Sequence, residues 1–226
     1  MAMPTNSGSE SANTCWDSVF LIGGGPSLRG MPLDLLTNRT TIAINDVGVH
    51  VPWATALFSL DPDWIVRRRD FVAAFKGERY LAAPAHIPRD IPSVTYMERV
   101  EAIGLSDDPQ TIHNGGTSGY GALNLAYLKG AKFIVLLGYD YCTIDGRCHW
   151  YDDEPSGSWD QDILDQWAAN FRSTTAQLRA KGITVVNASP ISRIDAFPKV
   201  PPERLFRSLE NDDELELLRR SYQQLY

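Results

Sequence analysis

Two short loops rich in glycine and hydroxyl groups carry the residues best suited to binding a phosphate. The first, Gly23-Gly24-Gly25-Pro26-Ser27, follows the apolar run 19–22. Glycine has no Cβ, so the backbone can approach a phosphate, and a helix that begins there turns free N–H groups and its positive end toward an anion. Ser27 adds a hydroxyl. We therefore predict a phosphate-binding turn here; the alternative is a strand-to-helix turn that binds nothing.

The second loop covers residues 114–119 and runs into a helical pattern over 120–128. Thr117, Ser118 and Gly119 offer two hydroxyls and backbone donors where that helix begins. An ordinary helix cap is the alternative for this loop taken alone. Two such loops beside central strands favour one shared anion site.

Acid–base chemistry is predicted at Asp140 and His149. Asp140 follows the apolar run 132–137, and His149 lies in the loop after it. A carboxylate and an imidazole that face one crevice can move a proton near neutral pH. The alternative is a loop histidine without a role in catalysis.

Further polar residues stand at expected strand ends. Asn45, Ser59 and Asn187 each follow or close an apolar run, where short polar side chains reach the base or ribose of a nucleotide lying across the sheet. Turn and capping roles compete with this interpretation. Asp61, followed by Pro62, is instead predicted to cap a helix over 61–75.

The loops do not match the motifs of common cofactors. A dinucleotide fingerprint would need glycine where Leu28 stands, and no Gly-Lys-Ser/Thr sequence follows the first glycines. The three cysteines, Cys15, Cys142 and Cys148, form no Cys-x-x-Cys pair, so we expect reduced thiols and no metal site.

Alternation of strands and helices predicts the fold class. We expect a single Rossmann-like α/β domain with a mostly parallel sheet, helices on both faces, and ligands beyond the carboxyl ends of the strands. Strands are predicted at 19–22, 40–44, 55–60, 132–137 and 183–186, and helices at 61–75, 120–128 and 158–181.

The predicted domain organisation has three parts. Residues 1–16 form a disordered tail, 17–200 the nucleotide-binding domain and 201–226 a helical tail with Leu215, Leu217 and Leu218 as an apolar stripe. This tail is predicted either to be a docking or dimer helix, which would make the protein a homo-oligomer, or to be an ordinary surface helix.

Charge and hydropathy argue against two classes of binding partner, nucleic acid and membrane. The net charge of −7 and a pI of about 5.1 oppose binding to nucleic acid. A polar start without an apolar leader, and no apolar run of membrane-spanning length, predict a cytoplasmic protein without a membrane partner.

The motifs Leu21–Leu28, Asn45, Gly116–Gly119 and Leu136–Asp140, in this order, resemble a known superfamily. Its members include sialyltransferases of the kind found in Campylobacter, motility accessory factor glycosyltransferases, archaeal 6-hydroxymethylpterin diphosphokinases and phage proteins. The resemblance runs from about Val19 to Pro198, and Asn187-Ala188-Ser189-Pro190 is similar to the segment after the last strand in the kinase and motility branches.

The sialyltransferase branch implies specific contacts with a nucleotide-sugar. By this resemblance, the donor phosphate would be bound by Gly24 or Gly25 together with Ser27. Asn45 would contact the nucleotide, and Asp140 would contact the nucleotide or the sugar. The donor would also be bound by Thr117, Ser118 and Gly119. Cys142 stands where these enzymes have a tyrosine, so the resemblance does not extend to sialic acid as the sugar.

Three functions follow from these observations. The leading hypothesis is a glycosyltransferase in which His149 deprotonates an acceptor hydroxyl that attacks a nucleotide-activated sugar; no cofactor is firmly implied. The first alternative is a diphosphokinase that binds ATP with Mg²⁺ on Asp140, Asp152 and Asp153. The second is a nucleotide-binding protein without turnover.

Overall fold

A computed structural model describes residues 16–152 and 159–224 as one α/β unit built on a single sheet. The predicted disordered tail over 1–16 therefore lies outside the described residues, except for Trp16. Eight strands form the sheet in the order β6-β5-β4-β3-β2-β1-β7-β8, and all neighbouring pairs are parallel. The strands are β1 Ser18–Ile22, β2 Thr41–Ile44, β3 Ala56–Ser59, β4 Glu78–Ala83, β5 Thr95–Val100, β6 Thr111–His113, β7 Phe133–Leu137 and β8 Thr184–Asn187.

The strand order reverses at β1. From β1 the chain builds outward through β2 to β6, then crosses to the opposite side of β1 to add β7 and β8. Phe20 pairs with Thr41 on one side of β1 and with Val135 on the other. Such a switch point opens a crevice at the carboxyl edge of a parallel sheet, which is the usual place for a ligand in this architecture.

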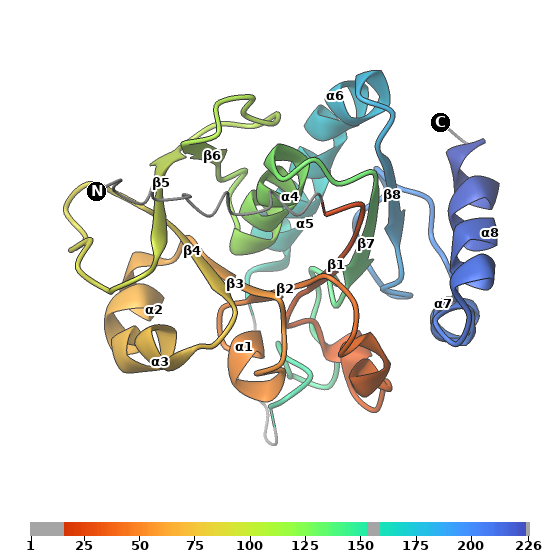
Figure 1. The fold of residues 1–226 in the computed structure, drawn as a ribbon, viewed down its shortest axis with the longest axis horizontal. Helices are drawn as coiled ribbons and strands as arrows, with labels where there is room; N and C mark the ends of the chain where they lie inside the picture. The colour runs from red at the N-terminus through yellow and green to blue at the C-terminus, as the bar shows by residue number, and fades with distance from the viewer. Residues whose placement is uncertain (1–15, 153–158, 225–226) are drawn as a thin grey trace, which may run out of the picture.

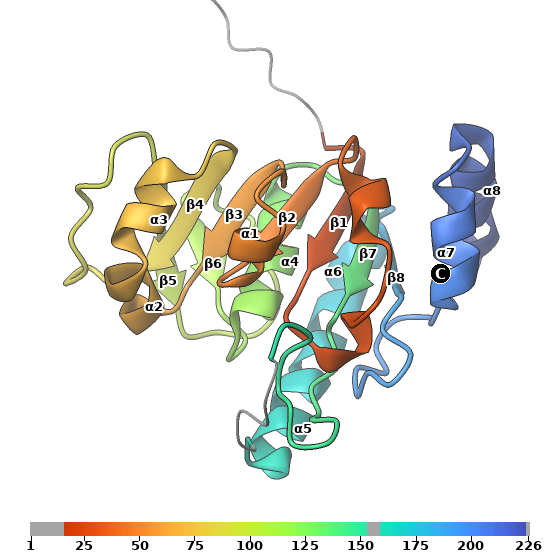
Figure 2. The same cartoon turned by 90° about the horizontal axis from the view of Figure 1, so that it is seen from below.

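Helices cover both faces of the sheet, as predicted (Figures 1 and 2). Figure 2 shows α1 (Val47–His50), α2 (Pro62–Arg67) and α3 (Arg69–Ala74) in front of the sheet, with α4 (Ser118–Leu128) and α6 (Thr175–Ala180) behind it. At the lower edge of that view, α5 (Gln161–Asn170) lies beside the loop that follows β7. Single 3-10 turns occur at η1 (Pro26–Leu28), η2 (Leu33–Leu36) and η3 (Phe171–Thr174).

The central strands β1, β2, β3 and β7 bury side chains on both faces because their sequences are mostly apolar. In β1, Val19 and Leu21 join the core under α4, while Phe20 and Ile22 join the core on the opposite face. β7 alternates in the same way and all five of its residues are buried. The sheet is therefore a rigid platform for the loops at its carboxyl edge.

Two predicted helices are interrupted. The segment 61–75 begins as expected, because the Asp61 carboxylate accepts the Trp64 N–H at 3.1 Å, but it divides into α2 and α3 at Arg68 (φ −103°, ψ 16°). The predicted helix 158–181 begins at Gln161 with Asp160 as its cap. It tightens into η3, where the Ser173 hydroxyl donates to the Asn170 carbonyl and the neighbouring threonines make the same type of bond.

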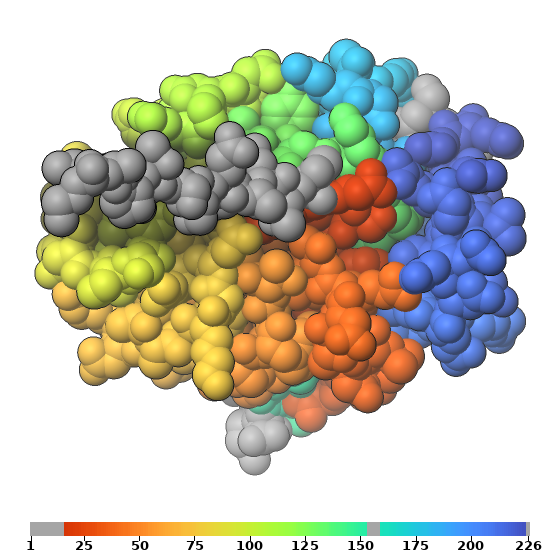
Figure 3. Space-filling view, viewed as in Figure 1, coloured from red at the N-terminus to blue at the C-terminus, as the bar shows by residue number. Residues whose placement is uncertain are grey.

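The C-terminal helices α7 (Pro202–Ser208) and α8 (Asp212–Gln223) pack beside β8, and the space-filling view shows them against the body of the molecule (Figure 3). Leu215 and Leu218 are buried in the same core as Phe20. The predicted apolar stripe was wrong at Leu217, which is 64% exposed. Residues two apart lie on different sides of a helix, so Leu217 points away from the face that holds Leu215.

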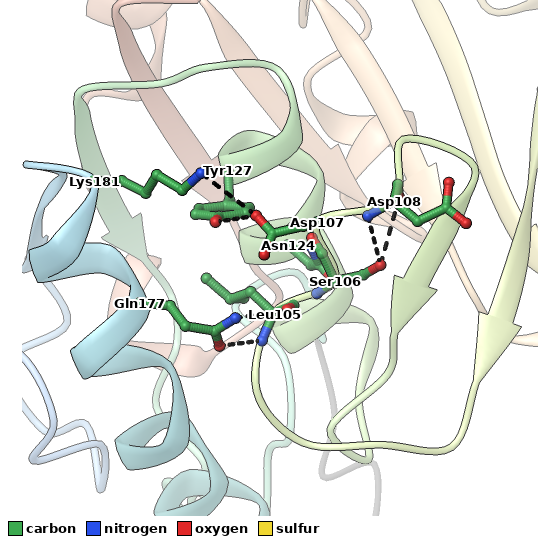
Figure 4. Close-up of polar contacts among 8 residues, drawn as sticks. All are labelled: Leu105, Ser106, Asp107, Asp108, Asn124, Tyr127, Gln177 and Lys181. Carbon is green, nitrogen blue, oxygen red and sulfur yellow. Dashed lines mark hydrogen bonds and ion pairs between the residues drawn. The ribbon is translucent and has the colours of Figure 1, made fainter.

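A polar network ties the β5–β6 loop to the helices around the site (Figure 4). The buried Asn124 side chain accepts the N–H groups of Ser106 and His113, each at 3.0 Å, and donates to the Ser106 carbonyl at 3.1 Å. Gln177 of α6 binds both backbone groups of Leu105, at 2.7 and 2.8 Å. These bonds fix β6 against α4 and so fix the loop in which α4 begins.

Across residues 16–152 and 159–224, we find no helix with both the length and the apolar character needed to cross a bilayer.

Candidate functional site

A cavity of ≈ 200 Å³ lies at the carboxyl ends of β1, β2 and β7, at the switch point of the sheet. It brings together most of the predicted site residues. Those that line it are Gly23, Gly24, Gly25, Asn45, Thr117, Ser118, Gly119, Asp140 and His149. Ser27, Ser59 and Asn187 are not among the lining residues.

The glycine-rich turn offers fewer free donors than its sequence predicts. The Gly23 and Gly25 N–H groups donate to backbone carbonyls at the end of β7, at 2.7 and 2.8 Å. The Ser27 N–H donates to Asp140. The expected helix with free N–H groups is one 3-10 turn, η1, whose serine donors are taken by that carboxylate.

Packing against the loop after β7 explains the glycines. A Cβ on Gly25 would lie 2.5 Å from Asp140 Oδ2, and a Cβ on Gly24 would lie 2.7 Å from His149 Cδ2. Real Cβ atoms do not approach other atoms this closely. The absence of side chains on this turn therefore lets the β1 and β7 loops meet, and it places His149 over Gly24.

Asp140 acts as the connection between these two loops. Its carboxylate accepts the Ser27 N–H at 2.7 Å and the Ser27 hydroxyl at 2.6 Å, and the residue is only 1% exposed. Burial raises the pKa of the Asp140 carboxyl, and the two bonds from Ser27 oppose that rise. Because Ser27 occupies both carboxylate oxygens, Asp140 is placed to hold the loops together.

The N-terminus of α4 presents backbone donors to the cavity. Thr117 is the cap: its hydroxyl accepts the Tyr120 N–H at 3.2 Å and shares a 2.8 Å hydrogen bond with the Tyr141 hydroxyl. The Ser118 hydroxyl accepts the Leu60 N–H at 3.4 Å. The first N–H groups of a helix have no acceptor within it, and Ser118 and Gly119, the first residues of α4, line the cavity, where the helix dipole favours an anion.

His149 is held by contacts on two sides. Its Nδ1 lies 3.3 Å from Asp152 Oδ2, which also accepts the His149 backbone N–H at 2.9 Å. The ring stacks on Tyr151 with centroids 5.1 Å apart, and Tyr151 stacks on His50 at 4.5 Å. A carboxylate on Nδ1 selects the tautomer with its proton there, which leaves Nε2 as the basic nitrogen.

Asn45 contributes an unused acceptor. Its backbone is left-handed (φ 53°), a conformation that asparagine adopts more readily than most residues. The Asn45 side-chain oxygen is buried at the cavity and has no hydrogen-bond partner among residues 16–152 and 159–224. A buried amide oxygen without a donor is unfavourable by about 1–3 kcal/mol, so a ligand donor at this point would be stabilising.

The three predicted residues outside the cavity are used by the fold. Ser27 binds Asp140, as described. The Ser59 hydroxyl accepts the Asp61 N–H at 3.2 Å, and the buried Asn187 amide oxygen accepts the Ser189 N–H at 3.0 Å. Their side chains thus form turns at strand ends, which was the alternative interpretation for Ser59 and Asn187.

Sequence reasoning missed the aromatic part of the cavity. Tyr141, Trp159, Leu164 and Trp167 line it together with Cys142 and Cys148. Trp159 and Trp167 were unremarkable in the sequence because they belong to an ordinary amphipathic pattern, and only their place beside the turn before α4 brings them to the site. Cys142 and Cys148 form no disulfide among the residues that the structure describes, and Cys15 lies outside them.

Two of the three carboxylates expected to bind Mg²⁺ already contact other groups of the protein. Asp140 is engaged by Ser27 and Asp152 by His149, while Asp153 lies outside the described residues. Within the described part of the chain, no three His, Cys, Asp or Glu side chains cluster as metal ligands. Asp140 and Asp152 as placed do not form a magnesium site with other described residues.

Comparison with solved structures finds a glycosyltransferase of the same fold. A Maf glycosyltransferase from Magnetospirillum magneticum AMB-1 superposes with a TM-score of 0.58 at 15% sequence identity, over 94% of this chain. The sialyltransferase CstII from Campylobacter jejuni, solved with cytidine-5'-monophosphate, gives 0.47 at 14% identity, over 82% of this chain and 86% of its own. No protein-family model and no curated protein sequence matches the chain.

The likeness to the Maf glycosyltransferase shows the fold, but it covers only part of that protein. The chain spans only 38% of the length of the Maf glycosyltransferase. The Rossmann-like α/β fold that the sequence predicts is confirmed.

Proposed function

We propose that this protein is a glycosyltransferase that moves a sugar from a nucleotide-sugar donor to an acceptor hydroxyl. One observation carries the proposal: Ser118 and Gly119, at the start of α4, and the oriented imidazole of His149 line the same cavity. An anion site beside a positioned base is what transfer from a nucleotide-sugar requires. The fold shared with the Maf glycosyltransferase is compatible with this chemistry.

In the proposed reaction, His149 Nε2 takes the proton of the acceptor hydroxyl. The acceptor oxygen forms a bond to the anomeric carbon while the bond from that carbon to the phosphate oxygen breaks. The electron pair leaves with the nucleotide phosphate, whose charge is stabilised by the Ser118 and Gly119 N–H groups. Asp152 stabilises the imidazolium that forms on His149.

The other residues of the cavity hold these groups in place. Asp140 fixes the two loops through Ser27, so it acts as a positioning residue. The unpartnered amide oxygen of Asn45 provides an acceptor for a base or ribose donor of the nucleotide. In this proposal the glycine-rich turn shapes the wall of the cavity, and α4 supplies the contact with the phosphate.

Ligand-dependent unfolding tests the proposal. The full chain is melted with CMP, UDP, GDP, ADP or ATP, each with and without Mg²⁺. A ligand at a hundredfold over its Kd stabilises by about 2.7 kcal/mol, which is a clear rise in Tm. A rise with CMP, UDP or GDP is expected. A rise with ATP that requires Mg²⁺ would favour the diphosphokinase, and no rise with any nucleotide would contradict nucleotide binding.

Turnover is then measured with the nucleotide-sugars of the nucleotide that binds, by release of free nucleotide. His149→Ala is compared with His86→Ala, which removes an exposed loop histidine outside the cavity. Loss of turnover with retained binding only in His149→Ala supports the proposed base. Binding without any turnover in the unmodified protein would favour a non-catalytic nucleotide-binding protein.

A further inference from the structure

Two tryptophans form an aromatic corner in the wall of the cavity. The ring centroids of Trp159 and Trp167 lie 5.8 Å apart at an interplanar angle of 62°, so the two rings pack edge-on and are inclined to each other like two sides of a corner. Leu164 lines the cavity beside them. Neither tryptophan takes part in the proposed transfer chemistry.

The fold sets Trp167 in place. Gly116 has a left-handed backbone (φ +95°), and a Cβ on it would lie 2.4 Å from Trp167 Cδ1, so the indole occupies the space that a side chain would fill. The Asn170 amide donates to the Gly115 carbonyl at 2.9 Å and anchors α5 on the same turn. The ring is therefore fixed next to the loop that leads into α4, before any ligand binds.

Trp159 remains accessible although it is large and apolar. It is 53% exposed and packs edge-on against Trp167. Burial of apolar area is worth about 25 cal/mol per Å², so a ligand that covers the exposed indole gains stability. An accessible aromatic surface in the wall of a cavity is suited to a ring with one apolar face.

We propose that this aromatic corner is the acceptor subsite and that it binds a pyranose ring through its C–H face. The inference rests on the proposed function, because only a transferase has an acceptor. A pyranose presents a face of C–H groups that packs on indole, while its hydroxyls stay at the edge of the ring. One hydroxyl of a sugar held there would face the cavity that His149 also lines.

The test uses saturation-transfer NMR on the full chain with the methyl pyranosides of glucose, galactose, mannose, N-acetylglucosamine and N-acetylgalactosamine. Spectra are recorded with and without CMP or UDP. The variants are Trp159→Ala, Trp159→Phe and, as a control on α5, Ile163→Ala, whose exposed apolar side chain does not line the cavity. Trp159 is exposed, so its replacement leaves the core intact.

We expect at least one pyranoside to receive saturation mainly at its ring C–H protons. Trp159→Ala should weaken its binding by roughly tenfold, Trp159→Phe should restore part of it, and Ile163→Ala should leave it unchanged. The proposal is wrong if no pyranoside binds, or if binding is unaffected by Trp159→Ala. The rise in Tm that a nucleotide produces in the same variants distinguishes the pyranose subsite from the proposed nucleotide binding. This rise should persist in all of the variants, whether or not a sugar binds.

Discussion

The Asp140 carboxylate accepts hydrogen bonds from both the backbone N–H and the hydroxyl of Ser27, although Ser27 and Asp140 lie 113 positions apart in the sequence. This pair joins the glycine-rich turn after β1 to the loop after β7, at the point where the order of strands reverses. The cavity is bounded by both loops, so its shape depends on the pair.

Replacing Asp140 with asparagine should loosen this connection. An amide can keep only one acceptor toward Ser27, so one donor loses its partner in a buried place, and the free energy of unfolding should fall by roughly 1–3 kcal/mol. Urea denaturation measures it. Ser27→Ala, which removes only the hydroxyl, should have a smaller effect; an equal or larger effect would contradict the role given to the backbone N–H.

The same carboxyl should give a distinct pH dependence of stability. Burial raises the folded-state pKa of Asp140 above its ordinary value of 3.8, so the folded protein binds more protons than the unfolded chain above that pH. This contribution to stability is present below 3.8 and is lost as the pH rises through the folded pKa. The difference in unfolding free energy between the unmodified protein and Asp140→Asn should therefore shrink as the pH rises through this window. A difference that grows would contradict the raised pKa.

Gly25→Ala should disturb the site through packing. The new Cβ would lie 2.5 Å from Asp140 Oδ2 and 2.6 Å from the Gly138 carbonyl, so the loops must separate, at a cost of roughly 1–3 kcal/mol. Gly30→Asn is the matched control, because Gly30 has nothing within 4 Å of a Cβ and asparagine tolerates its positive φ. Thermal unfolding of both variants measures the effect; equal Tm values would show that the contact is not tight.

Asn124 should be essential for the loop network that positions α4. Asn124→Leu leaves the Ser106 and His113 N–H groups and the Ser106 carbonyl without a partner, and each such group is unfavourable by about 1–3 kcal/mol. Asn124→Asp keeps the acceptor for both N–H groups and should be milder. Hydrogen exchange of the His113 amide checks the cause: it should accelerate in the leucine variant and stay protected in the aspartate variant.

Asp152→Asn should reduce turnover without preventing nucleotide binding. The amide can still contact His149 but it no longer stabilises the imidazolium, so we expect kcat to fall, and by less than the roughly 10²–10⁴-fold loss that removal of the base itself produces. An unchanged kcat in Asp152→Asn would contradict the role given to Asp152.

The sequence predicted β1, β2, β3, β7 and β8, because each of these strands contains a mostly apolar run that can be recognised from the local pattern. β5, with the sequence Thr-Tyr-Met-Glu-Arg-Val, has no such pattern. The sequence also predicted the Asp61 cap and gave an ordinary cap as the alternative for the loop of Thr117, since a cap is a contact within a few residues. The contact of Ser27 with Asp140 was not predictable from local pattern. Asp140 follows β7, and β7 pairs with β1 only in the folded sheet.

The aromatic corner could not be predicted for the same reason. Trp167 reaches the site because Gly116, far away in the sequence, leaves room for it. The helix over 158–181 reads as a surface helix, and its approach to the start of α4 is a tertiary contact that periodicity does not report. Likewise, the interruption of the predicted helix 158–181 at η3 involves side-chain bonds to the backbone, such as that of Ser173.

Amide NMR of the full chain titrated with CMP, UDP or GDP tests the central claim most directly. If the start of α4 binds the phosphate, the Ser118 and Gly119 amide signals should shift most, together with the Asn45 side-chain amide and the His149 ring. Their shifts should follow a single saturable curve. Shifts that are absent for every nucleotide, or that fall on residues outside the cavity while Ser118 and Gly119 stay unchanged, would contradict the proposed site.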